Sequence, residues 1–394
     1  MFPSPEFLLL QQSILIGTTE QAQRNAQQLL KEHVIDWAAF LGLVAYHSIQ
    51  PQVAGLFHTL PEGFVPATTR ERLKVANKAV AIRQLANVRE FLHIHALLKA
   101  KGITAVPYKG FWLAHSAYHS VTDRESSDVD LYILAEDLGE VQKIMFARGY
   151  VPETGSPDDD AQLILRHNGE YNFDQFEAGK RLYHIEFHAS ASSQKLGLDI
   201  GLADLRDQIN LQIFQGQIIP TFSPSALLFL TVLHHGGKDA WSNLKQVLDM
   251  GRLLQRYPDQ LDWQWLRQIN QRCDTERLLW VGLGLAQTLT GLSVPEFLQP
   301  ELDQAKVKGL IHNRLQRLMK SHISTENPYR AYARRLWFLL NSQRYWKTRW
   351  ILMLNHLKPS PVFDQSNRRE GLQRWLLVRV LSRLRALVWN TLSR

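Results

Sequence analysis

The spacing of the hydrophobic residues changes twice along this chain of 394 residues, and this change restricts the fold more than any other feature. Residues 6–100 carry apolar side chains at three- and four-residue spacing, which is typical of amphipathic helices. Residues 101–222 contain short β-prone segments instead. The helical spacing returns at Ser223-Pro224, where a Ser N-cap and a Pro in the first turn favour a helix start. The sequence therefore predicts an α/β unit between two helical regions.

Within the central unit, residues 128–134 form the clearest predicted strand. Val129, Leu131 and Ile133 alternate with other residues and would share one apolar face. A β-prone run at 103–108 precedes it, followed by Lys109-Gly110 and a short helix. Further expected elements are a helix at 136–148, and strands at 171–176 and 182–188 joined by a glycine-containing hairpin turn. Outside the unit, helices are expected at 70–101, 224–236, 240–257, 261–270 and 274–291.

The composition favours a folded protein, with 45% hydrophobic and 21% charged residues. The single cysteine, Cys273, excludes an internal disulfide framework and a multi-cysteine zinc site. We see neither a signal-peptide pattern at the start nor a run of about 18 apolar residues. On this basis we expect a cytoplasmic protein.

The net charge of +8 is distributed unevenly. Residues 301–394 hold 19 Lys and Arg against 5 Asp and Glu, a net charge of +14, which leaves −6 for residues 1–300. The basic region would suit an anionic partner or a membrane surface, although no specific nucleic-acid motif accompanies it. Residues 368–394 interleave Arg with Leu, Val and Trp, so as a helix they would either dock on a protein surface or lie at a membrane interface.

Asp128 and Asp130 stand two residues apart on the predicted strand, so both carboxylates point to the face opposite the apolar one. Two adjacent carboxylates repel each other unless a cation lies between them, and Mg²⁺ prefers such oxygen ligands. Glu186, in the later strand, is a candidate third carboxylate. We therefore predict a metal site at Asp128, Asp130 and Glu186, with Mg²⁺ or Mn²⁺ as the ion. These residues are also the candidate catalytic residues, because two such ions would activate an attacking oxygen and stabilise leaving pyrophosphate.

Three further residues are predicted to bind the phosphates of a substrate. Lys109 and Arg124 would neutralise phosphate charge, Lys as a point charge and Arg by a bidentate contact. Gly110 would let backbone amides at the start of the following helix approach phosphate oxygens.

The predicted strand at 182–188 admits a different metal site. His184, Glu186 and His188 share one face and match a two-histidine, one-carboxylate set for Zn²⁺ or Fe²⁺. The alternative is a partly exposed polar strand face, which we favour over metal binding by the histidines.

Three other motifs have a functional and a structural interpretation. His234-His235-Gly236-Gly237-Lys238 would place a base and a phosphate contact beside the site, or would end a helix, and we favour the helix end because Gly and Lys are common there. Asp158-Asp159-Asp160 is most simply a solvated loop. Asp249, on a predicted helix, would form a buried salt bridge or act in catalysis.

With these motifs in place, the chain resembles the uncharacterised nucleotidyltransferase family of bacteria, a branch of the DNA polymerase beta-like nucleotidyltransferase superfamily. The resemblance covers residues 30–290 loosely and 103–190 specifically. The residues that carry it are Ile35-Asp36-Trp37, Lys109-Gly110, Tyr118, Arg124, Asp128-Val129-Asp130, Gly149-Tyr150, Ile185-Glu186-Phe187-His188, Leu233-His234-His235, Lys238, Trp241, Leu244 and Asp249.

The resemblance implies an α+β fold, with a small mixed-sheet nucleotidyltransferase core flanked by N- and C-terminal helical regions. The corresponding division is 1–100 (helical), 101–222 (core), 223–300 (helical, packed on the core) and 301–394 (basic and helical). The implied activity is transfer of a nucleoside monophosphate from a nucleoside triphosphate to an unidentified acceptor, namely a glycan, a peptide or a small molecule. Two departures stand out: Lys109-Gly110 replaces the Gly-Ser pair of the superfamily, and Asp239 replaces a His common in the branch. The alternative is therefore a catalytically degenerate protein that binds nucleotide or scaffolds a biosynthetic complex.

Overall fold

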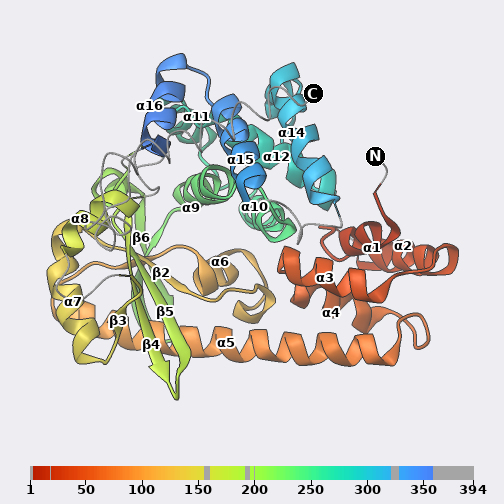
Figure 1. Ribbon diagram of the computed structural model, residues 1–394, viewed down its shortest axis with the longest axis horizontal. Helices are drawn as coiled ribbons and strands as arrows, with labels where there is room; N and C mark the ends of the chain where they lie inside the picture. Colours follow the sequence, from red (N-terminus) through yellow and green to blue (C-terminus); the bar gives the residue numbers. More distant parts are fainter. Residues whose placement is uncertain are drawn as a thin grey trace.

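The computed structural model describes residues 3–17, 19–154, 160–190, 196–198, 200–320 and 328–357. In these residues a five-stranded mixed sheet and a two-stranded sheet are flanked by helices (Figure 1). The fold is α+β, which confirms the class predicted from the sequence. No helix in the described part of the chain is both long and apolar enough to cross a membrane.

The larger sheet has the strand order β1-β2-β5-β4-β3, and its only parallel pair is β2 with β5. Its strands are β1 (Val106–Pro107), β2 (Val129–Tyr132), β3 (Val151–Pro152), β4 (Glu170–Glu177) and β5 (Lys180–His188). The expected strand at 128–134 is therefore shorter at both ends. The run at 103–108 forms a strand only over the two residues that pair with β2.

The alternation seen in the sequence sets the two faces of this sheet. Val129, Leu131 and Ile133 are completely buried in one hydrophobic cluster, together with Ile185 and Phe187 of β5. The helices that cover this face are α5 (Ala67–Ala100), α7 (Leu138–Ala147) and α8 (Ala161–Asn168). Because side chains alternate along a strand, the residues between these apolar ones project from the opposite face. That face carries the carboxylates of the site.

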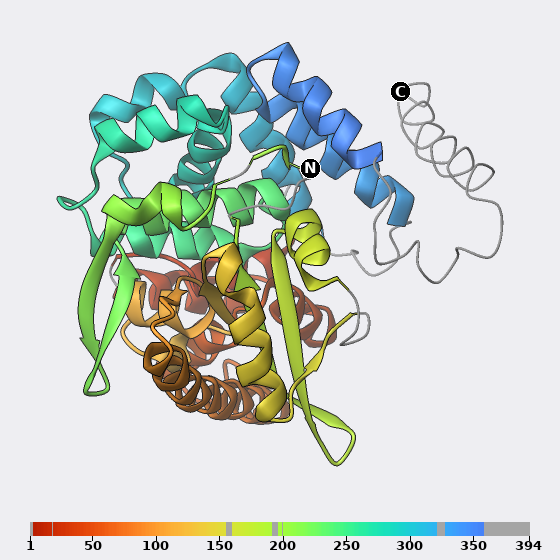
Figure 2. The ribbon, with the colours of Figure 1, turned by 90° about the vertical axis from the view of Figure 1, so that its left-hand side faces the viewer.

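Two hairpins use the same kind of turn. Ala178-Gly179 between β4 and β5 has φ values of 47° and 75°, as a two-residue turn that follows the strand twist requires. This hairpin is the one predicted from the sequence. The second joins β6 (Ile209–Phe214) to β7 (Gln217–Phe222) through Gln215-Gly216, and the sequence did not predict it. Figure 2 shows the two hairpins standing apart at opposite sides of the molecule.

The N-terminal region is helical, as expected. Its helices are α1 (Pro5–Gln12), α2 (Thr19–Glu32), α3 (Trp37–His47), α4 (Gln50–Thr59) and the 34-residue α5. A helix of that length extends about 50 Å, so α5 runs beneath both the N-terminal helices and the sheet (Figure 1). The short helices α6 (Gly110–Ala117) and η1 (Val121–Asp123) connect β1 to β2 above it.

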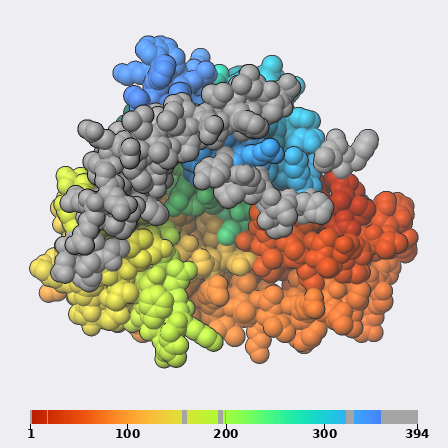
Figure 3. All heavy atoms as spheres, viewed as in Figure 1, coloured from red at the N-terminus to blue at the C-terminus, as the bar shows by residue number. Residues whose placement is uncertain are grey.

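The C-terminal region is also helical. Its elements are α9 (Pro224–Thr231), η5 (Val232–Lys238), α10 (Leu244–Arg256), α11 (Trp263–Arg272), α12 (Glu276–Thr290), η6 (Glu296–Leu298), α13 (Gln299–Leu302), α14 (Ala305–Leu318), α15 (Pro328–Ser342) and α16 (Trp346–Leu357). One hydrophobic cluster contains residues of α1, α3 and α4 together with residues of α9, α10 and α12. Figure 1 shows α9, α10 and α12 above both the N-terminal helices and the α/β unit, and in Figure 3 the cyan and blue C-terminal residues lie above the red and orange N-terminal helices. The four-part division of the chain stays a prediction.

The segment between α9 and α10 differs most from the expectation of two simple helices. Residues 232–238 form a π-helical segment, η5, continuous with α9. Ala240 and Trp241 follow with φ values of 55° and 51°, in the left-handed region that non-glycine residues rarely adopt. For this reason α10 begins at Leu244, where Asn243 caps it, and not at 240.

Candidate active site

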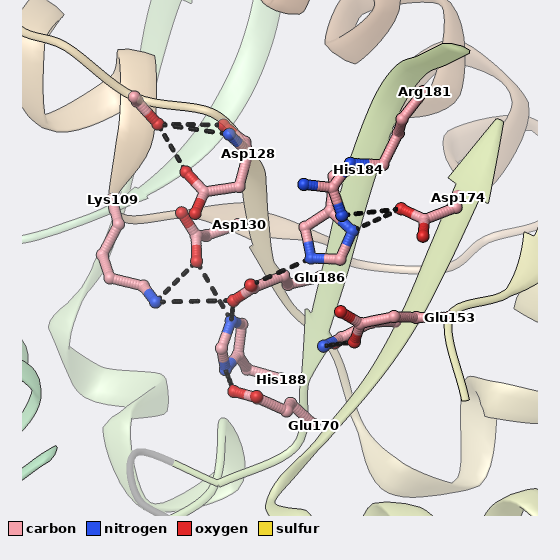
Figure 4. Close-up of polar contacts among 12 residues, drawn as sticks. Lys109, Asp128, Asp130, Glu153, Glu170, Asp174, Arg181, His184, Glu186 and His188 are labelled. Atoms are coloured by element: carbon pink, nitrogen blue, oxygen red, sulfur yellow. Dashed lines mark hydrogen bonds and ion pairs between the residues drawn. The ribbon is translucent and has the colours of Figure 1, made fainter. Parts of the chain in front are cut away.

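The register between β2 and β5 places the two central carboxylates beside each other. In this parallel pair Asp130 lies directly opposite Glu186. Asp130 is 2% exposed, and Glu186 is slightly more open. Both project from the face opposite Val129 and Leu131, so the structure brings together two of the three carboxylates predicted from the sequence (Figure 4).

The ammonium group of Lys109 lies between these carboxylates. Its Nζ is 2.6 Å from Asp130 Oδ1 and 3.7 Å from Glu186 Oε2. Burial lowers the pKa of Lys109, but Asp130 and Glu186 more than offset this and hold it well above its ordinary value. Lys109 therefore stays charged, and its ammonium supplies one positive charge beside the two carboxylates.

His188, the last residue of β5, contacts the same two carboxylates. Its Nε2 lies 3.2 Å from Asp130 Oδ1 and 3.2 Å from Glu186 Oε2, and its Nδ1 lies 3.4 Å from Glu170 Oε2. Burial and Lys109 lower the pKa of His188, while hydrogen bonds to Asp130 and Glu186 raise it, with a net increase. Lys238 in turn contacts Glu170 at 3.2 Å, so the ionic network extends to η5.

His184 lies one pleat further from the centre of the site. Its Nε2 is 3.2 Å from Glu186 Oε1, and its Nδ1 is 2.6 Å from Asp174 Oδ1 on β4. Burial lowers the pKa of His184, but hydrogen bonds to Glu186 and Asp174 outweigh burial and raise it to about 9. Burial likewise raises the pKa of Glu186, whereas Lys109 and the two histidines bring it well below its ordinary value. His184 thus acts on the site through Glu186.

Asp128 comes just before β2 and is held separately. The Ser126 hydroxyl donates to Asp128 Oδ1, and the Asn87 side chain of α5 donates to the Asp128 carbonyl at 3.4 Å. Gln84, one turn earlier on α5, donates to the Ser126 carbonyl at 2.7 Å. Burial raises the pKa of Asp128, and the charges of Asp130 and Glu186 raise it further. Three polar residues that the sequence analysis missed therefore fix the segment that carries this carboxylate, and Ser126 contacts the carboxylate itself. For Gln84 and Asn87 the signal was a polar side chain on the buried face of a long helix.

Gly110 is required by the geometry of the turn. Its φ is 53°, and a Cβ built on it would lie 2.9 Å from the carbonyl oxygen of Asp128 and 3.2 Å from Ser126 Oγ. A side chain here would push the start of α6 away from the carboxylates. Glycine thus permits the close approach of the Lys109-Gly110 turn to the segment that carries Asp128.

Arg124 supports the same turn from the other side. It is 5% exposed, and its Nη1 donates to the Gly110 carbonyl at 3.2 Å. Its Nε and Nη2 donate to Asp249 Oδ1 and Oδ2 of α10, at 2.8 and 2.9 Å. Asp249 also accepts hydrogen bonds from Tyr118 at 2.7 Å and His235 at 2.9 Å. Burial raises the pKa of Asp249, but Arg124 outweighs it and lowers the pKa. Asp249 therefore forms a buried salt bridge, one of the two roles predicted for it.

A cavity of about 120 Å³ opens between the α/β unit and the first C-terminal helices. It is lined by residues of three segments: Lys109 and Gly110; Arg124, Ser126, Ser127, Asp128 and Asp130; and His234, His235, Asp239, Asn243, Lys245 and Gln246. A larger cavity of about 720 Å³, between α4 and α5, shares no lining residue with it. Since the ionisable groups gather at the smaller cavity, we take it as the candidate active site.

The donors around Asp130 fit a divalent cation. Ligand atoms of Asp130, Glu186 and His188 lie within 4.8 Å of one another. Carboxylate oxygens suit Mg²⁺ and Mn²⁺, and the imidazole of His188 suits a softer metal. Asp128 lines the cavity together with Asp130 but is not part of this ligand group, so the set of Asp128, Asp130 and Glu186 stays a prediction. The alternative set predicted from the strand, with His184, Glu186 and His188, shares two residues with the group, Glu186 and His188.

The remaining sequence motifs fall outside this cluster. Asp160 is the N-cap of α8, where its Oδ1 accepts from the Leu163 amide at 3.0 Å, and residues 158 and 159 lie outside the described residues. The basic segment 368–394 also lies outside them. The motif from His234 to Lys238 does end a helix, as favoured, because η5 ends at Lys238; Gly236 and Gly237 lie inside η5 without a positive φ, however, so neither glycine is the cap.

Facing carboxylates on neighbouring parallel strands, beside a lysine-glycine turn and a cavity, are typical of proteins that bind a phosphate substrate together with a cation. Residues 33–291 match the model of a protein family described as uncharacterised nucleotidyltransferase, and the chain belongs to this family. The resemblance noted in the sequence is thereby confirmed. Membership implies general nucleotidyl transfer with a nucleoside triphosphate as substrate. A comparison with curated proteins found no match.

Proposed function

We propose that the protein transfers a nucleoside monophosphate from a nucleoside triphosphate to an acceptor, with Mg²⁺ or Mn²⁺ held by Asp128, Asp130 and Glu186. The observation that carries this proposal is the buried pair of Asp130 and Glu186 with the Lys109 ammonium between them. Buried carboxylates that face each other are costly without a cation. Such an arrangement is useful where a metal and phosphates are to be bound.

The reaction would proceed by attack of an acceptor hydroxyl on the α-phosphate. A bond forms between the acceptor oxygen and the α-phosphorus, and the bond from the α-phosphorus to the bridging oxygen breaks. Pyrophosphate leaves with that oxygen, and the hydroxyl proton passes to a carboxylate of the site, for which we propose Glu186. The bound cation would supply charge neutralisation for the phosphates and for the attacking oxygen. The chain contributes mainly position and charge.

Lys109 and Gly110 would bind the triphosphate. As Asp130 and Glu186 take up the cation, the Lys109 ammonium would pair with a phosphate oxygen, a short movement within the same cavity. Gly110 would bring the first amides of α6 close to the phosphates. For Arg124 we expect an indirect part in phosphate binding, because three of its nitrogens already donate to Asp249 and Gly110. It would orient the turn that carries Lys109.

The acceptor would be a glycan, a peptide or a small molecule. The test is a screen of ATP, GTP, CTP and UTP with Mg²⁺ or Mn²⁺ and a cell extract as the source of acceptor, with release of pyrophosphate as the readout. The control is the double variant Asp128→Ala with Asp130→Ala. We expect release with the wild-type chain and none with the variant. Full activity in the double variant would show that the site assignment is wrong.

One observation favours a second candidate, a catalytically degenerate protein that binds nucleotide. Lys109 and His188 both contact Asp130 and Glu186 without a metal, so the site can be stable as an ion-pair network. In that case nucleotide binding would survive the loss of Asp128 and Asp130, and pyrophosphate would not appear with any triphosphate. Equilibrium binding of a fluorescent nucleotide to both chains distinguishes the two functions.

A further inference from the structure

A second group of metal-ligating side chains faces the cavity from the helical region. His234 and His235 of η5 and Asp239, the residue after it, each offer one ligand atom, and these atoms lie within 4.8 Å of one another. All three line the cavity that also contains Asp128 and Asp130. His235 is buried, whereas His234 and Asp239 are partly exposed. The group is therefore open to the cavity on one side.

We propose that His234, His235 and Asp239 form a site for a transition-metal ion such as Zn²⁺, separate from the carboxylate site. Two imidazole nitrogens and one carboxylate oxygen are a ligand set that this class of metal prefers and that Mg²⁺ does not. The fourth coordination position would face the cavity and be available to water or to a phosphate oxygen.

The distances between the ligand atoms suit a tetrahedral ion. His234 Nδ1 lies 3.2 Å from His235 Nδ1 and 3.6 Å from Asp239 Oδ2. Bonds of about 2.0–2.1 Å around a tetrahedral Zn²⁺ separate neighbouring ligand atoms by roughly 3.3–3.4 Å. The two measured distances lie on either side of this value. The ligand atoms of His235 and Asp239 lie within 4.8 Å of each other, so all three ligands can reach one ion.

Neighbouring side chains orient two of the three ligands. Asp249 lies 2.9 Å from His235 Nε2, so that nitrogen carries the proton and Nδ1 presents its lone pair to the site. A carboxylate behind a ligating histidine is the usual support for such a ligand. Gln246 donates to Asp239 Oδ2 at 2.8 Å and fixes that carboxylate while leaving a lone pair of the oxygen free.

The backbone of η5 is shaped by packing in a way that keeps the ligands together. A Cβ on Gly236 would lie 2.8 Å from the Trp241 indole, and one on Gly237 would lie 2.6 Å from Leu196. The two glycines therefore allow the π-helical segment to pack tightly. Ala240 and Trp241 then turn the chain in the left-handed region and leave Asp239 beside His234. π-Helical turns are frequent at functional sites.

Nearby cationic side chains limit how tightly the ion would bind. Burial lowers the pKa of His234, and Lys109, His235 and Lys238 lower it further, so its imidazole is neutral and has one nitrogen lone pair with which to ligate. The same lysines, and Arg335 acting on Asp239, oppose a dication. We expect weaker binding than at a structural zinc site with four protein ligands. A bound triphosphate would strengthen it by adding negative charge.

The test is a titration of the metal-free full chain with Co²⁺, which gives a visible absorption spectrum in a tetrahedral site. Excess Mg²⁺ occupies the carboxylate site throughout. We expect one Co²⁺ per chain, displaced by Zn²⁺, and loss of this signal in the double variant His234→Ala with Asp239→Asn. His33→Gln is the matched control, because His33 is exposed and away from the cavity.

A gain-of-signal variant keeps the test decisive if the double variant folds poorly. His234→Cys replaces one ligand by a thiolate, which gives an intense near-ultraviolet band when it binds Co²⁺. The wild type, whose only cysteine is the buried Cys273, supplies the baseline. Absence of the new band would overturn the proposal. So would a Co²⁺ signal that is lost when Asp128 and Asp130 are both replaced by Asn but is kept in His234→Ala with Asp239→Asn, because the ion would then bind at the carboxylate site. Pyrophosphate release is measured separately, so this site and the proposed nucleotidyl transfer can fail independently.

Discussion

Two buried ionic clusters meet at the Lys109-Gly110 turn, and they differ in the ratio of carboxylates to permanently charged cations. The Arg124 cluster, formed by Arg124, Asp249, Tyr118 and His235, contacts the carbonyl of Gly110. The carboxylate cluster, formed by Asp128, Asp130 and Glu186 with Lys109 and His188, contacts the side chain of Lys109. Both clusters come from residues distant in the sequence, and both exclude most solvent.

In the Arg124 cluster, charge and hydrogen bonds are balanced. One carboxylate faces one guanidinium in a bidentate contact, and each oxygen of Asp249 also accepts from a second donor, Tyr118 or His235. A buried ion pair with every lone pair satisfied has no need of an external ion. This cluster holds α6, η1 and α10 in place.

In the carboxylate cluster, the carboxylates outnumber the one permanently charged cation. Three carboxylates gather around one lysine, and His188 and His184 add only the positive charge that their protonation supplies. Burial raises the pKa of Asp128, and the neighbouring charges of Asp130 and Glu186 raise it further. From this comparison we predict that the Arg124 cluster maintains the fold and that the carboxylate cluster binds a cation.

Among the variants that test this comparison, we expect the largest effect, a loss of activity, for Glu186→Gln. This change keeps the shape of the side chain but removes one charge of the cluster. It should reduce pyrophosphate release by at least about 10³-fold, or roughly 4 kcal/mol of transition-state stabilisation. The metal-free chain should keep its stability, because Lys109 retains Asp130. Glu177→Gln, an exposed carboxylate at the end of β4, is the matched control. Wild-type activity in Glu186→Gln would show that Glu186 is not a functional residue of the site.

For Asp249→Asn, in the Arg124 cluster, we expect a loss of stability in place of the loss of activity expected for Glu186→Gln. The substitution leaves the buried charge of Arg124 without its anion, which should lower the free energy of unfolding by roughly 3 to 5 kcal/mol. Urea denaturation measures this, with the exposed Asp259→Asn as the control. If Asp249→Asn unfolded like the wild type while losing activity, Asp249 would belong functionally to the carboxylate cluster and the distinction would fail.

His47 extends the comparison to a buried ionisable group without a charged partner. Its Nδ1 accepts from the Leu244 amide, and burial lowers its pKa from 6.5 to about 4. The fold favours the neutral form of His47. The free energy of unfolding is therefore unaffected by His47 above about pH 6.5, and it decreases as the pH falls toward 4 because the unfolded chain binds a proton that the folded chain does not. The loss should reach about 3 kcal/mol. Urea denaturation at several pH values should show a steeper acid loss for the wild type than for His47→Gln. Equal slopes would mean that His47 is not responsible.

Local pattern was enough to predict the strand that carries Asp130 and a central unit with strands between two helical regions. Alternation of Val129, Leu131 and Ile133 defines a buried face, so the face on which Asp128 and Asp130 lie follows from the sequence alone. The β4–β5 hairpin was predictable for a similar reason, since Ala178-Gly179 favours the turn. These features depend on neighbours in the chain.

Features that depend on distant neighbours were not predictable. Arg124 and Asp249 are 125 residues apart, and no local signal distinguishes a paired arginine from one that binds phosphate. The glycines of η5 fit a helix end in sequence, but packing against Trp241 and Leu196 accounts for them. The β6–β7 hairpin was missed because Leu211 and Ile213 are exposed, so hydrophobicity does not mark its buried face.

The smallest expected effects compare one hydroxyl from each cluster. Tyr118→Phe removes the donor to Asp249, a hydrogen bond to a charged group, and should lower the free energy of unfolding by about 1.5 kcal/mol with little change in activity. Ser126→Ala removes the donor to Asp128 and should leave stability nearly unchanged, because Asp128 is partly exposed and lines the cavity, where water can replace the hydroxyl. It should instead slow pyrophosphate release about tenfold, roughly 1.4 kcal/mol, since Asp128 loses its fixed orientation. Urea denaturation and pyrophosphate release are measured on both variants. If Ser126→Ala lost stability and Tyr118→Phe lost activity, the carboxylate cluster would maintain the fold and the Arg124 cluster would act in the reaction, contrary to our assignment.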